Sequence, residues 1–82
     1  MTMAIREEAR ALLATALEIE AAAVPDDAQI ETLEAWTSVA HLRLVLAIEE
    51  RLGAELKPDD AVAIASLADV MALLARKAAS AA

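Results

Sequence analysis

The sequence predicts an all-α fold, a four-helix bundle with a long loop between the first two helices and a short third helix. Strong helix formers dominate the 82 residues, with 23 alanines, whereas the chain has only one aromatic residue, Trp36, and one glycine. The hydrophobic fraction of 60% is too high, for the charge carried, for a disordered chain. Apolar residues also recur at helical spacing, and breaker residues divide the chain into four such segments.

The first predicted helix covers residues 4–20. Its apolar side chains follow the spacing of one helix face and are Ile5, Ala9, Leu12, Leu13, Ala16 and Leu17. The sequence Val24-Pro25-Asp26-Asp27 then begins a loop that continues to Thr37. Because loops of this length are uncommon in compact domains and are often functional, we expect it to be pinned across the bundle, with Trp36 as its packing plug.

The second predicted helix has a recognisable signal at each end. It begins at Thr37 or Ser38, because either hydroxyl could cap the amides of the first turn. It ends at Gly53, the only glycine of the chain, which suits the left-handed conformation of a C-cap.

Two further signals predict the third and fourth helices. A third helix over residues 57–64 has proline where the first turn tolerates it. A fourth helix begins at residues 66–69, where Ser-Leu-Ala-Asp is a capping-box variant with aspartate in the glutamate position. The sequence shows no internal repeat and no linker, so we expect a single domain over residues 1–82. Its core is expected in residues 4–77, and its alanine-rich end, residues 78–82, is expected to fray.

The charge balance excludes several classes of function. Fourteen acidic and seven basic residues give a net charge of −7, and residues 11–42 contain no Lys or Arg. Such a surface repels nucleic acid and attracts basic protein partners. With no cysteine and one histidine, the chain lacks the residues of a disulfide framework, a thiolate nucleophile or a metal cage. No segment approaches the roughly 20 apolar residues of a membrane span, and no secretory signal is visible, so a cytoplasmic location is expected.

The second predicted helix has two apolar faces. At about 100° per residue, one arc suits a buried stripe and consists of Leu44, Val45, Ile48 and Leu52. The other arc consists of Val39, Leu42 and Leu46, and the charged residues beside it are Arg43, Glu49 and Glu50. Because packing into one core needs only the first arc, we expect the second arc to be a protein-docking surface. The alternative is that other helices cover both faces.

The order of these signals is similar to that of the acyl carrier protein family. Thr37-Ser38-Val39 and the helix that follows it resemble the family's Asp-Ser-Leu motif and second helix. Downstream, the chain has further matches in the family's order and spacing, at Leu52-Gly53, Pro58-Asp59-Asp60, and Ser66-Leu67 with Asp69-Val70. The resemblance covers residues 5–76, and the ordered set is fairly specific. It implies a four-helix bundle of the acyl-carrier type.

The resemblance implies that Ser38 is the attachment point of a covalent 4′-phosphopantetheine and that the protein is a carrier, not an enzyme. The thiol at the tip of this arm would hold an acyl or aminoacyl group as a thioester. The implied partners are a phosphopantetheinyl transferase, an acyl- or aminoacyl-loading ligase and downstream transferases, which would meet a monomeric carrier. The residues expected to contact these partners are Val39, Leu42, Arg43, Leu46, Glu49 and Glu50. A hydroxyl at a helix start suits this role, because a phosphodiester there faces unpaired amides.

Three positions depart from the family's pattern. Thr37 stands where the family has aspartate, and Val39 stands where it has leucine. Arg43 lies on a helix that is acidic in fatty-acid carriers, so like-charge contact would disfavour the basic patches of fatty-acid enzymes. These departures predict a specialised acyl or aminoacyl carrier, as used in secondary metabolism, rather than the housekeeping fatty-acid carrier.

Other interpretations of the same residues stay open. Ser38 taken alone would be a plain N-cap, and an unmodified helical adaptor of this fold would dock partners through the second arc. His41 could touch the arm, although a partly buried structural histidine is the interpretation we favour. The acidic pairs at residues 26–27 and 59–60 are interpreted as solvated turn residues and not as ligands of a divalent ion. No nucleophile–base pair is visible, so catalysis is not expected.

Overall fold

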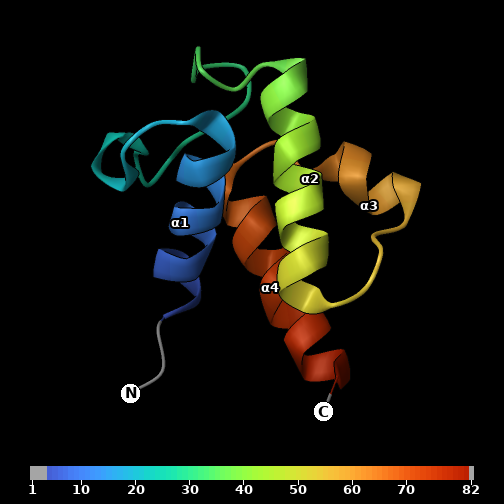
Figure 1. Cartoon of the computed structure of the whole chain (residues 1–82). Coiled ribbons are helices and arrows are strands. Elements are labelled where there is room, and N and C mark those ends of the chain that lie inside the picture. The colour runs from blue at the N-terminus through green and yellow to red at the C-terminus, as the bar shows by residue number, and fades with distance from the viewer. Residues whose placement is uncertain (1–3, 82) are drawn as a thin grey trace.

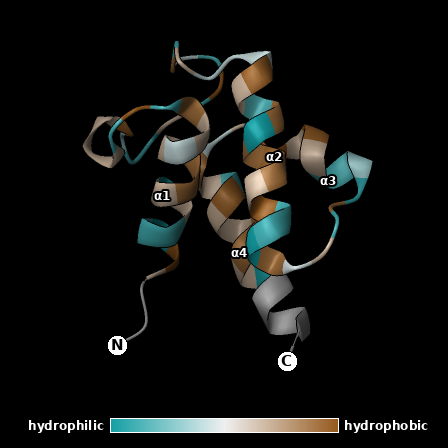
Figure 2. Cartoon of the chain, in the orientation of Figure 1, coloured by the Kyte–Doolittle hydropathy of each residue, from teal (hydrophilic) through white to brown (hydrophobic). Residues whose placement is uncertain are grey.

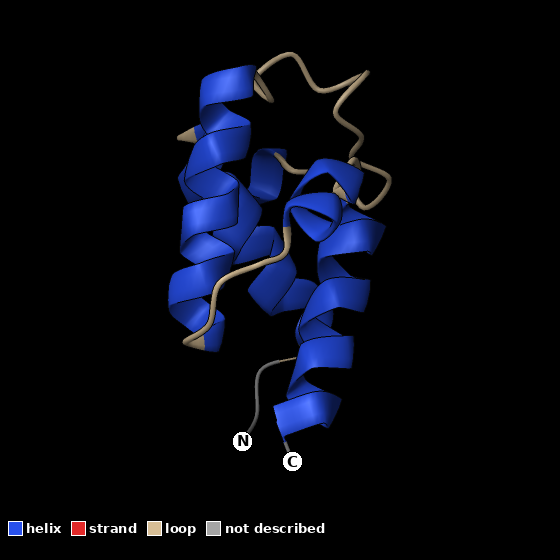
Figure 3. Cartoon of the chain, turned by 90° about the vertical axis from the view of Figure 1, so that its right-hand side faces the viewer, coloured by secondary structure: helices blue, strands red, loops and turns tan. Residues whose placement is uncertain are grey.

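The described part of the chain folds into helices joined by loops. The computed structural model describes residues 4–81, with side chains as far as Arg76. The elements, in chain order, are α1 (Ile5–Leu17), the 3₁₀ turn η1 (Ala21–Ala23), α2 (Ser38–Leu52), α3 (Pro58–Ala63) and α4 (Leu67–Ala81). Helices α1, α2 and α4 pack against one another, and α3 lies on the other side of α2 from α1 (Figure 1). The predicted all-α bundle, with its long first loop and short third helix, is confirmed (Figure 3). Fraying at residues 78–82 stays a prediction, because their side chains lie outside the described residues.

Helix α1 ends at Leu17, three residues before the predicted end. Glu18 adopts the left-handed conformation, with φ 58°, and its N–H donates to the carbonyls of Ala14 and Thr15. The N–H of Ile19 donates to the Ala14 carbonyl at 3.0 Å. Glycine usually occupies the left-handed position of such a helix end. The glutamate at this position carries no sequence signal for it.

Both predicted ends of α2 are confirmed. Thr37 is the N-cap, and its hydroxyl accepts a hydrogen bond from the Ala40 N–H at 3.1 Å. Ser38 is therefore the first residue of the helix and is not its cap. At the other end, Gly53 takes a φ of 69°, and its N–H donates to the Glu49 carbonyl at 2.8 Å.

The two C-terminal helices begin as their sequences predict. Helix α3 starts with Pro58 and is one residue shorter than predicted at each end. Before α4, the Ser66 hydroxyl accepts from the Asp69 N–H at 3.1 Å, and the Asp69 carboxylate accepts from the Ala65 N–H at 2.9 Å. The predicted capping box is confirmed, with the carboxylate bonded one residue further upstream than in the usual pattern.

Apart from Trp36, the core consists of aliphatic side chains, many of them small. Its fully buried large side chains are Leu13, Val24, Leu44, Ile48, Leu67, Val70 and Leu74. Its buried alanines are Ala9, Ala14, Ala16, Ala28 and Ala40. Figure 2 shows that hydrophobic and hydrophilic residues alternate along the helices. An alanine methyl group needs little room, so the helices can approach one another closely.

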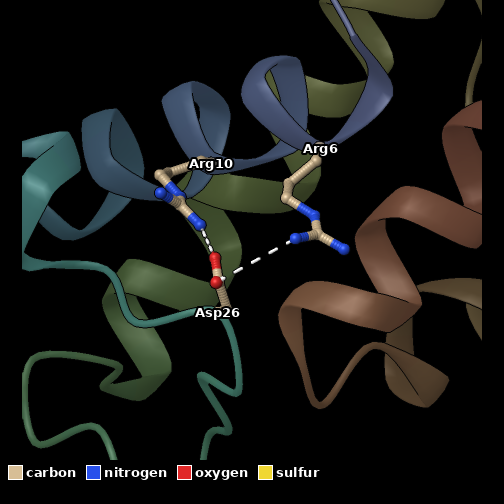
Figure 4. A network of polar contacts seen from close by, with 3 residues as sticks. All are labelled: Arg6, Arg10 and Asp26. Atoms are coloured by element: carbon tan, nitrogen blue, oxygen red, sulfur yellow. Dashed lines mark hydrogen bonds and ion pairs between the residues drawn. The ribbon is translucent and has the colours of Figure 1, made fainter.

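The long loop is fastened to the bundle by buried and charged contacts. Trp36 is only 4% exposed, which confirms its predicted role as a packing plug. The Asp26 carboxylate forms ion pairs with Arg6 and Arg10, which both project from α1 (Figure 4). These contacts hold the loop against the bundle at both of its ends.

Backbone hydrogen bonds join the middle of the same loop to the start of α4. The Ile30 N–H donates to the Ala65 carbonyl at 2.8 Å, and the Leu67 N–H donates to the Ala28 carbonyl at 3.0 Å. They flank an isolated antiparallel bridge between Gln29 and Ser66. The loop is therefore held in a fixed position beside the start of α2.

Candidate functional site

Ser38 is exposed at the first position of α2. The Thr37 hydroxyl caps the helix through Ala40, so capping does not occupy the Ser38 hydroxyl. Sequence alone left open which of the two hydroxyls is the cap. Because the cap falls on Thr37, the Ser38 oxygen is available for another role.

The start of α2 favours a negatively charged group. The amides of its first turn have no acceptor within the helix, and the dipole of this 15-residue helix places partial positive charge there. No acidic residue lies in the first turn of α2 to oppose an added anion. A phosphate on the Ser38 oxygen would lie beside these amides.

The second apolar arc of α2 is exposed, as predicted. We call Val39, Leu42 and Leu46 the apolar strip, and their side chains are 60%, 61% and 57% exposed. On the opposite face, Leu44 and Ile48 are fully buried. No helix in the described chain covers the strip, so the alternative of an arc buried by its neighbours is wrong.

A hollow of about 350 Å³ opens beside Ser38, between the long loop, α2 and α3. Its lining residues are Ile30, Ser38, His41, Val62, Ile64 and Ala65. Val62 of α3 is 82% exposed and adds an apolar side chain at its rim. Sequence patterns did not predict the contribution of Ile30 and α3, because these residues come together only through the packing of loop and helix.

His41 is a partly buried structural residue, as the favoured interpretation held. Its Nδ1 accepts a hydrogen bond from the Trp36 indole N–H at 3.0 Å. Its Nε2 lies 2.9 Å from the Ala61 carbonyl oxygen of α3. Both ring nitrogens are thus engaged by the protein.

Two of the charged residues beside the apolar strip also hold the fold together. The Arg43 Nε–H donates to the Ala16 carbonyl at 2.9 Å, and its guanidinium lies 3.6 Å from a Glu18 carboxylate oxygen. The Glu49 carboxylate accepts from the Leu56 N–H at 2.8 Å, which anchors the loop before α3. The sequence predicted neither contact. Glu50 is exposed to solvent.

One aspartate of each acidic pair outside this region is paired with arginine, and the second pair lies in the first turn of α3 rather than in a loop turn. Asp26 pairs with Arg6 and Arg10, and Asp60 lies 3.2 Å from Arg76. Within the described residues, no three acidic or histidine side chains converge as a metal site would require. No helix there combines the length and apolar character needed to cross a membrane.

A comparison with known protein families matches most of the chain. A family model described as a phosphopantetheine attachment site matches residues 7–74, which is most of the chain. A search of curated proteins gives no match.

Proposed function

The chain belongs to the phosphopantetheine-attachment family, whose domains carry a covalent 4′-phosphopantetheine, and we propose that Ser38 carries it here. The observation that supports this assignment is the exposed Ser38 hydroxyl at the first position of α2, with capping left to Thr37. The unpaired amides of that turn favour the charge of a phosphodiester. The residues at the start of α2 therefore fit the group.

When bound, the group supplies a thiol on a flexible arm, which holds an acyl or aminoacyl cargo as a thioester. The chain itself anchors and presents the arm. Ser38 provides the oxygen of attachment, and the buried face of α2 holds that oxygen in place through Leu44 and Ile48. Such a tether raises the effective concentration of its cargo at each partner.

The apolar strip is the surface that we propose for partner enzymes. It begins next to Ser38 and follows the exposed face of α2. Apolar anchors dominate the binding energy of small interfaces, and charged residues at their edge set orientation. Arg43, Glu49 and Glu50 occupy that edge. The partners are a phosphopantetheinyl transferase, a loading ligase and downstream transferases.

The departures at Thr37 and Arg43 support a specialised acyl or aminoacyl carrier. Thr37 keeps the capping function of an aspartate but not its charge. Arg43 is held by the Ala16 carbonyl, so its positive charge stays at the edge of the apolar strip. A partner with a basic patch, as fatty-acid enzymes have, would be disfavoured there. We expect a monomer in the cytoplasm.

Intact-mass measurement tests the assignment of Ser38. Wild-type protein should gain the mass of one phosphopantetheine when incubated with coenzyme A and a broad-specificity transferase. Ser38→Ala should gain none. Ser66→Thr is the matched control, because it removes another serine while keeping a hydroxyl at the N-cap of α4, and it should gain mass like the wild type.

The other outcomes separate the alternatives. A gain retained in Ser38→Ala would place the attachment elsewhere. No gain by the wild type with several transferases would favour the unmodified adaptor, which would use the same apolar strip without an arm.

A further inference from the structure

His41 connects three elements of the domain through a single side chain. It lies on α2, one turn after Ser38, and accepts from the Trp36 indole of the long loop at 3.0 Å. Its other nitrogen lies 2.9 Å from the carbonyl oxygen of Ala61 in α3. The Trp36 and His41 rings are also stacked, with centroids 6.1 Å apart and an interplanar angle of 22°.

The partners of His41 define where its proton is. An indole N–H only donates, so the Nδ1 facing Trp36 must be an unprotonated acceptor. A carbonyl oxygen only accepts, so the Nε2 facing Ala61 must carry the hydrogen. The ring is therefore a neutral bridge that takes a hydrogen bond from the loop and donates one to α3.

Helix α3 is held through the residues that flank it and through polar contacts. None of its residues is buried. Leu56 before it and Ile64 after it are buried in the core. Polar contacts are added by Asp60, which pairs with Arg76, and by the Leu56 N–H, which donates to Glu49. The bond from His41 reaches the Ala61 carbonyl directly from the first two turns of α2.

We propose that His41 is a positioning residue that sets the distance between α3 and Ser38. The same contact sets the width of the hollow beside Ser38 and the place of Val62, the exposed apolar side chain of α3. An enzyme that docks over both helices then meets the apolar strip and Val62 at a fixed spacing. This inference rests on the proposed function, because the enzyme concerned is the one that modifies Ser38.

Two amide substitutions separate the two bonds of His41. Glutamine places its amide nitrogen near the position of Nε2, so His41→Gln should keep the bond to Ala61 and lose the one to Trp36. Asparagine places its oxygen near the position of Nδ1, so His41→Asn should keep the bond from Trp36 and lose the one to Ala61. The pair therefore serves as matched controls for each other.

The first readout is the NMR spectrum of the unmodified protein. Imidazole nitrogen shifts of the wild type should identify a neutral ring protonated at Nε2. The amide signals of residues 58–63 should move or broaden in His41→Asn and stay near wild type in His41→Gln. The Trp36 indole signal should respond in the opposite order. Unchanged signals of residues 58–63 in His41→Asn, or a proton at Nδ1, would overturn the proposal.

The second readout is the modification of Ser38 by a transferase. In His41→Asn we expect KM to rise about two- to tenfold, as for the loss of one partly buried hydrogen bond, with little change in kcat. His41→Gln should keep the wild-type KM. A rise in His41→Gln with a wild-type KM in His41→Asn would assign the effect to the Trp36 bond. An equal rise in both variants would show that the bond to Ala61 has no effect of its own, and either result would overturn the role of Ala61. If the wild type is not modified at all, the proposed function fails, and the NMR readout still decides whether His41 positions α3.

Discussion

Thr37 and Ser38 perform separate tasks at the start of α2. The Thr37 hydroxyl satisfies the Ala40 amide, whereas Ser38 stands outside the capping interaction with its side chain exposed. A serine that also capped the helix would have to give up that bond when its oxygen became a phosphodiester. With the cap one residue earlier, the proposed modification of Ser38 would leave the helix end intact.

Replacing Thr37 with valine tests this division. Valine has nearly the same shape but no hydroxyl, so Thr37→Val should lower the free energy of unfolding by about 1 kcal/mol. Thr37→Asp restores a capping oxygen and should match the wild type. Urea unfolding of the three proteins measures the difference. Equal stability of Thr37→Val and the wild type would mean that this hydroxyl does not cap α2.

Leu44 and Leu46 offer a matched comparison of the two faces of α2. Leu44 is fully buried, so Leu44→Ala should cost about 2–5 kcal/mol, which approaches the whole stability expected for a domain of this size. Leu46 is 57% exposed, so Leu46→Ala should stay within about 0.5 kcal/mol of the wild type. Thermal melts measure both.

Activity measurements complete this comparison. Leu46→Ala should slow the modification of Ser38, because it removes an anchor from the apolar strip. A wild-type rate of modification would remove Leu46 from the docking surface. A loss of stability as large as that of Leu44→Ala would show that the strip belongs to the core.

At the scale of elements, the end of α1 is tied to the middle of α2. Helix α1 stops at Leu17, which leaves the Ala16 carbonyl without a partner in its own helix. The Arg43 Nε–H donates to that carbonyl, and the guanidinium lies near Glu18. Arg43 is therefore a tie between two helices as well as a charge beside the apolar strip.

Loss of this tie should be measurable in variants of Arg43. Arg43→Met keeps the aliphatic stem and should lower the free energy of unfolding by about 1 kcal/mol. Arg43→Glu should cost more, because it adds a carboxylate near Glu18 and the Ala16 carbonyl. Glu50→Gln, an exposed change on the same helix, is the control and should be neutral in urea unfolding. If Arg43→Met is also neutral, the contact with α1 does not stabilise the domain.

The same two variants test whether Arg43 selects against fatty-acid enzymes. Both lose the positive charge, so loading or transfer by such enzymes should improve in both, and more in Arg43→Glu. Improvement in neither variant would contradict a role for this charge in specificity.

The sequence predicted what depends on neighbours along one helix and missed what depends on tertiary contacts. The C-cap at Gly53 and the two faces of α2 follow from residue type and helical spacing and were predicted, whereas the choice between Thr37 and Ser38 as N-cap was left open. The early end of α1 was not predicted, because the glutamate at position 18 gives no sequence signal for a left-handed conformation. The contacts of Arg43 and His41 join residues 27 and 20 positions apart, which no periodicity encodes.

At the scale of the whole molecule, a frame of three helices carries two attached pieces. The frame is α1, α2 and α4, which share the buried core. The long loop and α3 are attached to it, in part, by charged and polar contacts, such as those of Asp26 and His41. The loop also contributes Val24, Ala28 and Trp36 to the core, so loss of its polar contacts alone should leave the three-helix frame folded.

Asp26→Asn tests how much the loop attachment contributes. Its carboxylate is exposed, so loss of the pairs with Arg6 and Arg10 should cost less than about 1 kcal/mol. The difference from the wild type should shrink as salt is added. Asp27→Asn changes the neighbouring exposed acid and serves as the control for net charge. A cost that is large and independent of salt would show that the loop is part of the frame.

The fully buried Ala40 sets a limit on how this domain can be re-engineered. It lies two residues after Ser38, where the first turn of α2 meets the core and where the space left is that of a methyl group. A larger side chain there would push that turn outward and displace Ser38, the proposed attachment residue, with it. Substitutions of exposed residues on α2 would change the proposed docking surface and leave the core unchanged. A larger side chain in place of Ala40 would instead move Ser38 and the apolar strip together.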